Sequence, residues 1–273
     1  MYPEFAWEFL GNEISIKAYA LFTVVGALGG VLVALPILRR QGVPFRQSLG
    51  LFILMAPAFL IGARLLNYLV NPKAYGSNLK IYSFRLAGFS FYGGLLGALL
   101  AFLFWQRRTK KPLWSLLDAL VLPGVVAFSL ARLGCFFNGC CGGKPTQSLL
   151  GMDFPIRGGN EKLLSLFLGS LGQSTTHIKV YPTQLFELGL ALVFLLPIYY
   201  LYLKRKLPKG GAFLIYAAAF SAMRLMVLPL RNLPYPDLVK VFFYPLLYLS
   251  IIVLSILQCK KLQGAEKKAS IKR

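Results

Sequence analysis

Long apolar segments separated by short polar ones dominate the chain. A membrane-spanning helix needs about 20 mostly apolar residues, and seven segments fit that length. They lie near residues 18–38, 49–70, 86–105, 115–133, 184–203, 212–230 and 238–258. This pattern predicts an all-α integral membrane protein with about seven transmembrane helices.

The fourth of these segments leaves two interpretations open. Pro123-Gly124 interrupts it, and its carboxyl end runs on into Cys135 and Asn138 without a polar stop. Proline removes a backbone hydrogen bond from a helix interior and bends or breaks the helix. Six spans plus a re-entrant segment is therefore the alternative to seven complete spans.

The distribution of Lys and Arg predicts the orientation, because cytoplasmic loops hold an excess of both. Basic residues gather in alternate connections: Arg39, Arg40 and Arg46, then Arg107, Arg108, Lys110 and Lys111, then Lys204, Arg205, Lys206 and Lys209. We expect a membrane domain over 1–259 with its N-terminus outside, and a basic cytoplasmic tail at 260–273. The one long connection, 134–183, is then external and is expected to hold a small external subdomain.

The composition agrees with a membrane protein and changes the meaning of the net charge. The chain is 57% hydrophobic and 14% charged, with a mean hydropathy of +0.63. A net charge of +21 on a soluble protein would suggest nucleic acid. Here most basic residues lie in short loops beside apolar segments, so the sequence predicts no nucleic-acid partner.

Ionisable and polar residues inside the spans are candidates for a functional site. A charge in hydrocarbon costs roughly 2.5–3.5 kcal/mol on insertion scales. With the predicted orientation, a set of such residues falls at the level of the outer leaflet: Tyr19, Arg64, Tyr92, Arg132, Gln184, Glu187 and Arg224. Arginine binds phosphate through two parallel hydrogen bonds, so the set predicts a site for lipid headgroups. The alternative is that the arginines reach the interface or pair with Glu187 for structural reasons.

Two groups of glycines have different interpretations. Gly26 and Gly30 have the four-residue spacing that lets helices pack closely, and close packing is the interpretation we prefer. Gly93 and Gly94 directly follow Tyr92. This arrangement fits either a headgroup pocket or an ordinary interfacial tyrosine.

Three cysteines lie close together after the fourth span. Cys135, Cys140 and Cys141 alternate with glycines in what the sequence predicts to be a tight loop. A disulfide, for example between Cys135 and Cys140, is one interpretation, and a reactive thiol beside Arg132 is another. A metal site needs more ligands than the loop supplies, and His177 is distant in sequence, so none is expected.

Short motifs spread along the chain resemble those of a known family. The motifs are Tyr19-Ala20-Leu21, Gly62-Ala63-Arg64-Leu65, Ser90-Phe91-Tyr92-Gly93-Gly94-Leu95-Leu96-Gly97, Ala131-Arg132-Leu133-Gly134-Cys135-Phe136-Phe137-Asn138-Gly139, Tyr181-Pro182-Thr183-Gln184-Leu185-Phe186-Glu187, and Arg224 with Arg231. In order and spacing they resemble the prolipoprotein diacylglyceryl transferase family. The loop that begins at Arg132 is the most specific of them.

The resemblance implies an enzyme of the bacterial inner membrane. Its reaction passes the diacylglyceryl group of phosphatidylglycerol to the lipobox cysteine of a secreted prolipoprotein, the first step of lipoprotein maturation, and needs no cofactor. By family position, the resemblance implies that Arg132 and Arg224 are the essential arginines, that Asn138 and Gly143 shape the loop and that Tyr19 lines the pocket. Together with the polar residues at the level of the outer leaflet, this gives the expected site: catalysis by Arg132, Arg224 and Tyr92, and substrate binding by Tyr19, Arg64, Gly93, Gly94, Asn138, Gly143, Gln184 and Glu187.

The chain departs from the family at several positions near these residues. Tyr92 stands where the family typically has His, Cys135 replaces Asn and Cys140 replaces Glu. Phe220 and Leu228 stand where Tyr and Glu are usual. A phenol with a pKa near 10 is a poor general base. The alternative to a divergent transferase is therefore a protein of the same fold that binds or transfers another anionic phospholipid group.

Overall fold

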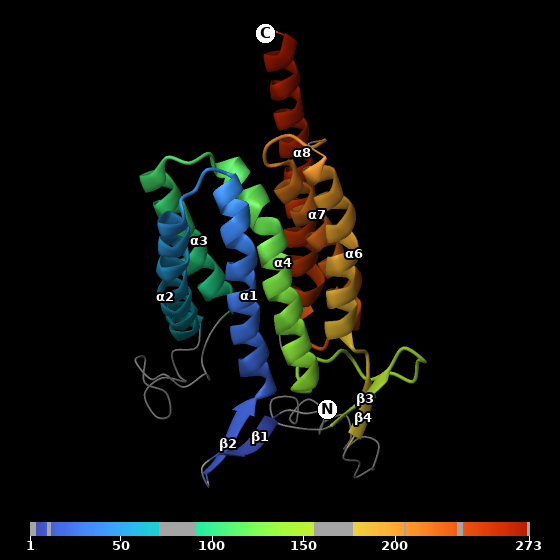
Figure 1. Ribbon diagram of the computed structural model, residues 1–273. Helices are drawn as coiled ribbons and strands as arrows, with labels where there is room; N and C mark the ends of the chain where they lie inside the picture. The colour runs from blue at the N-terminus through green and yellow to red at the C-terminus, as the bar shows by residue number, and fades with distance from the viewer. Residues whose placement is uncertain are drawn as a thin grey trace. The chain divides into compact units, whose positions relative to one another are not determined.

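A computed structural model describes residues 4–9, 12–70, 91–155, 177–204, 206–233 and 237–271. Seven long helices lie in these ranges: α1 (Ala18–Arg40), α2 (Phe45–Val70), α3 (Phe91–Thr109), α4 (Leu113–Phe137), α6 (Thr183–Leu203), α7 (Gly211–Val227) and α8 (Tyr244–Ile271) (Figure 1). The chain divides into two compact units. The first comprises residues 1–33 and 120–273, and the second residues 34–119.

Six of the helical segments in the described ranges are long and apolar enough to cross a membrane. They are Ala18–Arg40, Phe45–Leu69, Leu113–Phe137, Thr183–Leu203, Gly211–Leu230 and Val239–Lys268. The described part of α3 is 19 residues long and ends with Arg107 and Arg108 in its last turn. The prediction of an all-α, multi-pass membrane protein is confirmed.

Helix α4 differs from the sequence prediction at its carboxyl end. It is continuous over 25 residues with Pro123 inside it, so this segment is a complete helix long enough to span a membrane. It extends to Phe137, four residues beyond the predicted end. The prediction that Cys135 lies in a loop is therefore wrong, because Cys135 belongs to the last turn of α4.

In the unit of residues 34–119, glycines bring α2 and α3 together. A Cβ atom on Gly93 would lie against the carbonyl oxygen of Gly62 and 2.5 Å from Cβ of Leu66. A Cβ atom on Gly94 would lie 2.6 Å from the ring of Phe59. Gly93 therefore requires glycine for close helix packing, whereas a side chain at Gly94 would require the ring of Phe59 to move. Near the opposite ends of these helices, the indole nitrogen of Trp105 donates to the carbonyl oxygen of Gln47 at 3.1 Å.

In the other unit, α1 packs closely against α4. A Cβ atom on Gly26 would lie 3.0 Å from the carbonyl oxygen of Ala127, and one on Gly30 would lie 3.1 Å from that of Pro123. The close packing predicted for Gly26 and Gly30 is confirmed. A buried apolar cluster joins α6 and α7 through Ala191 and Met223.

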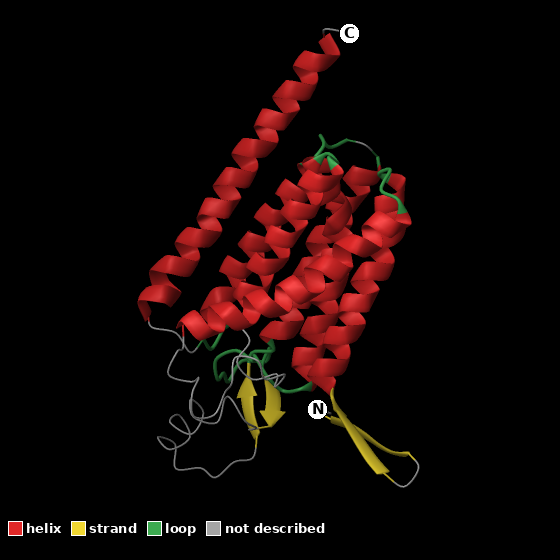
Figure 2. Ribbon diagram, turned by 90° about the vertical axis from the view of Figure 1, so that its left-hand side faces the viewer, coloured by secondary structure: helices red, strands yellow, loops and turns green. Residues whose placement is uncertain are grey.

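Two short antiparallel strand pairs accompany the helices of this unit. Strand β1 (Glu4–Phe9) pairs with β2 (Asn12–Lys17), and β3 (Met152–Pro155) pairs with β4 (His177–Val180). Both pairs lie at the end of the unit where α4 ends and α6 begins, whereas the C-terminus lies at the other end (Figure 2). Segment 134–183, which the sequence predicts to hold a small external subdomain, contains β3 and β4, while residues 156–176 lie outside the described ranges. The external position of this segment stays a prediction.

Candidate functional site

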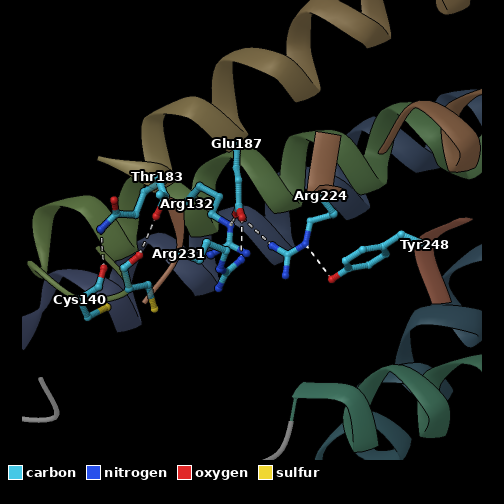
Figure 3. Close-up of polar contacts among 9 residues, drawn as sticks. Arg132, Cys140, Thr183, Glu187, Arg224, Arg231 and Tyr248 are labelled. Atoms are coloured by element: carbon cyan, nitrogen blue, oxygen red, sulfur yellow. Dashed lines mark hydrogen bonds and ion pairs between the residues drawn. The ribbon is translucent and has the colours of Figure 1, made fainter. Parts of the chain in front are cut away.

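A single buried carboxylate lies at the centre of a charged cluster. Glu187, in the second turn of α6, keeps 1% of its side-chain surface exposed. Its Oε1 accepts hydrogen bonds from Nη1 of Arg224 and Nη1 of Arg231, both at 2.6 Å (Figure 3). Its Oε2 pairs with Nε of Arg132 at 2.8 Å. Three arginines from three parts of the chain therefore converge on one acidic group, and we call these four residues the arginine cluster.

The arginine cluster carries more positive than negative charge. Three guanidinium groups face one carboxylate, which leaves two net positive charges. The side chains of Arg132, Arg224 and Arg231 are 17%, 13% and 13% exposed, respectively, so solvent screens them only partly. One bond to Glu187 uses one of the five N–H donors on Arg132 and on Arg231. The arrangement can therefore attract an anion.

Neighbouring aromatic side chains orient two of the arginines. Nε of Arg224 donates to the hydroxyl of Tyr248 in α8 at 3.4 Å. The guanidinium of Arg132 lies over the ring of Phe128, 5.0 Å from its centroid. A cation over an aromatic face is attracted by the negative face of the ring. Both guanidiniums are thus held in fixed directions from two sides.

The loop after α4 is attached to the start of α6. Gln184 donates from Nε2 to the carbonyl oxygen of Cys140 at 2.5 Å, and Thr183 donates from Oγ1 to that of Cys141 at 3.1 Å. The backbone of Lys144 donates to the carbonyl oxygen of Leu230, after α7, at 2.7 Å. These bonds place the loop beside the start of α6, which contains Glu187, and beside the segment after α7, which contains Arg231.

Gly143 allows the closest of these approaches. Its backbone nitrogen donates to the carbonyl oxygen of Tyr181 at 2.8 Å. A Cβ atom at this position would lie against the carbonyl oxygen of Leu230, 2.8 Å from Cβ of Tyr181 and 2.9 Å from Cγ2 of Thr183. A larger residue would push the loop away from the site.

Three free thiols form a second cluster beside the arginines. The Sγ atoms of Cys135, Cys140 and Cys141 all lie within 4.8 Å of one another. We call this group the thiol cluster. Cys135 is buried, Cys140 is partly exposed and Cys141 is exposed. The predicted disulfide between Cys135 and Cys140 stays a prediction for the oxidised protein.

The surroundings of the thiol cluster favour a thiolate at its exposed member. Hydrogen bonds from Cys135 and Cys140 lower the pKa of the Cys141 thiol from its ordinary value. The positive charges of Arg132 and Arg231 act in the same direction, while burial opposes them. Asn138 hydrogen-bonds to the thiol of Cys140. The two clusters are therefore electrostatically connected.

Most of the residues predicted from the sequence meet in this one region. They are Arg132, Asn138, Gly143, Gln184, Glu187 and Arg224, together with the thiol cluster. Tyr19 belongs to it as well, because a Cβ atom on Gly134 would lie 3.4 Å from Cα of Tyr19, and the phenol interacts electrostatically with the three thiols. The pairing with Glu187 that the sequence offered as a structural alternative is observed for Arg132 and Arg224.

The remaining predicted residues belong to the unit of residues 34–119. Arg64 is buried there at 6% exposure, and Gly93 and Gly94 pack α3 against α2. Tyr92 lies in the first turn of α3, and its side chain is outside the described residues. A direct role of these four residues in the site stays a prediction.

Three residues of the site were not assigned a role from the sequence. Arg231 and Thr183 each lie one residue outside a predicted span, where polar residues are ordinary. Tyr248 lies inside an apolar span and gives no local signal. Their inclusion in the family motifs was the one available indication for Arg231 and Thr183.

Comparison with known proteins identifies similar sequences over most of the chain. Residues 5–259 match the family described as prolipoprotein diacylglyceryl transferase. Proteins named phosphatidylglycerol--prolipoprotein diacylglyceryl transferase from Clostridium tetani and Clostridioides difficile are each 26% identical to it. These matches cover 81% and 80% of this chain and 83% and 80% of those proteins. The protein of that name from Bifidobacterium adolescentis is 29% identical over 82% of this chain and 68% of its own.

Proposed function

The chain belongs to the prolipoprotein diacylglyceryl transferase family, and from this premise we propose that its arginine cluster holds the headgroup phosphate of the lipid substrate. The protein is a membrane transferase of lipoprotein biosynthesis, with phosphatidylglycerol and a prolipoprotein as its substrates. The observation that carries the proposal is the contact of three arginines with one carboxylate that is 1% exposed.

The charge of the arginine cluster suits the change of charge during the reaction. Phosphatidylglycerol presents a phosphodiester with one negative charge. When the sulfur of the lipobox cysteine bonds to the glyceryl carbon, the carbon–oxygen bond breaks and glycerol phosphate leaves. A phosphate monoester carries about −1.5 to −2 charges near pH 7. Two net positive charges therefore attract the departing group more strongly than the bound lipid, which is the condition for catalysis.

In this proposal, Arg132 and Arg224 contact the phosphate, and Arg231 supports them. Glu187 is a positioning residue, because its carboxylate oxygens face arginines and it is almost completely buried. It holds the three guanidinium groups close together and in fixed directions, because its negative charge offsets their mutual repulsion. Gln184 positions the loop through the carbonyl oxygen of Cys140.

The other predicted residues have supporting roles in the proposal. Tyr19 and Asn138 lie beside the thiol cluster, and Gly143 keeps the loop close to Arg231. Gly93 and Gly94 act through the close contact of α2 and α3, which bears Arg64 and Tyr92. Tyr92 is the candidate general base by family position.

We further propose that the N-terminus faces the outside of the bacterial cytoplasmic membrane and that the C-terminus faces the cytoplasm. The ends of α1 and α3 that carry Arg39, Arg40, Arg107 and Arg108 would then be cytoplasmic, as the usual distribution of basic residues favours. A reporter enzyme that is active only in the cytoplasm, fused after Arg273, should be active. An active periplasmic reporter at the same position would reverse the orientation.

The function is tested with the purified full-length protein, phosphatidylglycerol and a lipobox peptide. The expected result is a gain in peptide mass equal to a diacylglyceryl group, with one glycerol phosphate released for each peptide modified. A peptide with Ser in place of the lipobox Cys is the matched control and should remain unmodified. Lipid binding without either product, with every anionic phospholipid tried, would overturn the transferase assignment of this chain.

A further inference from the structure

The thiol cluster has the dimensions of a metal site. A zinc ion bound tetrahedrally by thiolates has zinc–sulfur distances of about 2.3 Å, which places the sulfurs roughly 3.8 Å apart. The Sγ atoms of Cys135, Cys140 and Cys141 lie within 4.8 Å of one another. Small side-chain rotations that move the Sγ atoms by about 1 Å would therefore bring all three sulfurs to zinc-binding distance.

The number of ligands distinguishes this site from a closed structural one. Within the described part of the chain, the group of ligand atoms comprises the three thiols alone. Structural zinc sites have four protein ligands, whereas catalytic zinc sites have three and keep the fourth position for water or substrate. Cys135 is buried and Cys141 is exposed. The cluster thus has a closed side within the protein and an open side.

The backbone of the loop is held by neighbouring side chains. Thr183 and Gln184 donate to the carbonyl oxygens of Cys141 and Cys140. The thiol of Cys140 donates to the carbonyl oxygen of Cys135 at 3.6 Å, a weak bond that metal binding would replace. Cys141 has a left-handed backbone with φ of 62°, which is uncommon for residues other than glycine. Such a conformation persists only where the surrounding structure fixes it.

The position of the thiol cluster fits a substrate thiol. Arg132 lies three residues before Cys135 on α4, which is about one helical turn. The charges of Arg132 and Arg231 act on Cys141. A sulfur bound at the open side of the thiol cluster would therefore lie next to the phosphate proposed for the arginine cluster.

We propose that Cys135, Cys140 and Cys141 bind a zinc ion and that the lipobox cysteine of the substrate takes its fourth position as a thiolate. This proposal rests on the transferase function above and assigns the activation of its nucleophile. Zinc-bound thiols lose their proton at neutral pH. The zinc site would therefore deprotonate the substrate thiol, a task for which the phenol of Tyr92 is a poor general base.

The proposed step is balanced without an oxidant or reductant. The substrate thiol displaces a zinc-bound water and releases its proton to solvent. An electron pair of the bound sulfur then forms the bond to the glyceryl carbon. The carbon–oxygen bond breaks, and its electron pair leaves with the phosphate oxygen of glycerol phosphate. The product is a neutral thioether, which binds zinc weakly, so water can return.

The charge of the site is also reasonable. Three thiolates without a metal would place three negative charges within a few ångströms. Zinc reduces the sum to one negative charge, and to two once the substrate thiolate is bound. Arg132 and Arg231 are the neighbouring cations that compensate the remainder. Copper(I) with three thiolates is already fully coordinated and would offer no position for a substrate, and for this reason we assign zinc.

The first test is the metal content of the full-length protein purified under reducing conditions. We expect one zinc per chain, and loss of that zinc in Cys140→Ser and in Cys141→Ser. Cys259→Ser is the matched control, because Cys259 lies in α8 outside the thiol cluster and its loss should leave the zinc in place. Thermal melting of each variant shows that it is folded.

The second test is the coordination of the zinc, measured by X-ray absorption. Addition of a lipobox peptide should raise the number of sulfur ligands from three to four, and the Ser-containing peptide should leave it at three. Removal of zinc by a chelator should lower transfer by on the order of 10²-fold, as for loss of a general base, and added zinc should restore it.

The outcomes separate this proposal from the proposed function. Full transfer by zinc-free protein would overturn the zinc proposal and leave the transferase function standing. The same holds for zinc retained in both Ser variants, for copper(I) as the bound metal, for a sulfur count that stays at three, and for a Cys135–Cys140 disulfide in protein taken from membranes. Zinc binding with no transfer under any condition would instead reject the transferase function and, with it, the role in thiol activation.

Discussion

Both units pack helices through glycines, but one of them also contains a contact made of charged side chains. In residues 34–119, Gly62 and Gly93 let the backbones of α2 and α3 touch, and the atoms nearest to these glycines are backbone and apolar side-chain atoms. In the other unit, α4, α6, α7 and the segment after α7 meet around Glu187 through ion pairs. Small residues are the ordinary way to pack membrane helices. Buried charges are expensive there and mark function.

The glycine contact and the arginine cluster differ in whether unneutralised charge remains after the helices have packed. The glycine contact is complete in itself, since its partners are backbone and apolar atoms. The arginine cluster is not electrically complete, because one carboxylate cannot neutralise three guanidiniums. A purely structural ion pair would need one arginine. The excess of charge is therefore the feature that separates a binding site from a packing contact.

The largest effect is expected for loss of a phosphate-binding arginine. Arg132→Ala and Arg224→Ala should each lower transfer by on the order of 10²–10³-fold, the usual size for one lost transition-state donor. The amount of folded protein should change little, since the other two arginines still neutralise Glu187. Arg107→Ala, in the last turn of α3 and outside the arginine cluster, is the control and should keep its activity. Active proteins after both changes would remove the phosphate site.

The next largest effect is expected for removal of the negative charge of Glu187. Glu187→Gln keeps the shape of the side chain but raises the net charge of the cluster from two to three. Removing one partner of a buried ion pair destabilises a protein by about 3–5 kcal/mol, so the free energy of unfolding should fall. We also expect a lower KM for phosphatidylglycerol together with a lower kcat, because the guanidiniums attract the lipid but lose their alignment. An unchanged kcat per folded molecule would make Glu187 purely structural.

The third prediction tests the glycine contact between α2 and α3. Gly93→Leu should separate α2 from α3 and destabilise the protein by roughly 1–3 kcal/mol or more. Gly50→Leu is the matched control in α2, because a Cβ atom there meets nothing within 4 Å. Thermal melting measures both. Equal stability of the two variants would mean that the α2–α3 contact does not depend on glycine.

The fourth prediction concerns the loop that joins the two clusters. Gly143→Ala should displace the loop from Leu230 and Thr183 and lower transfer about tenfold, since small displacements of catalytic groups reduce rates strongly. Gly189→Ala, in α6, places its Cβ atom in open space and serves as the control. Rates that are alike for the two variants would show that the loop tolerates movement.

The smallest effect is expected for Tyr248→Phe. The bond from Arg224 to the hydroxyl is long, at 3.4 Å, and one hydrogen bond contributes roughly 0.5–1.5 kcal/mol. Transfer should therefore fall by about tenfold at most, with normal folding. A loss as large as that of Arg224→Ala would make Tyr248 a catalytic partner instead of a supporting residue.

The sequence predicted the helices better than their ends. Apolar length alone identifies the spans, but Cys135 and the two phenylalanines after it are apolar, so the pattern has no signal for the true end of α4 at Phe137. The strands β1 and β2 were not predicted either. Phe5, Trp7 and Phe9 alternate with other residues as in a strand, yet six residues give a weak signal beside a long apolar helix.

For the site, the sequence predicted the residues that have a local signal and missed the others. Arg132, Glu187 and Arg224 are polar residues in apolar spans, so each is visible by itself. Arg231 is 44 residues from Glu187 along the chain, and its contact depends on the turn after α7 and on the bridge to Gly143. The gathering of the three thiols likewise follows from the extension of α4, which brings Cys135 back to Cys140. Contacts of this kind come from tertiary structure and leave no local pattern.

The most direct test of the central claim is the steady-state kinetics of Arg224→Ala with phosphatidylglycerol and a lipobox peptide. If the excess positive charge stabilises the departing phosphate, kcat should fall by on the order of 10²-fold or more while KM for the lipid changes much less. A variant with an unchanged kcat and a raised KM would contradict the account. The arginine cluster would then bind the lipid without assisting its reaction.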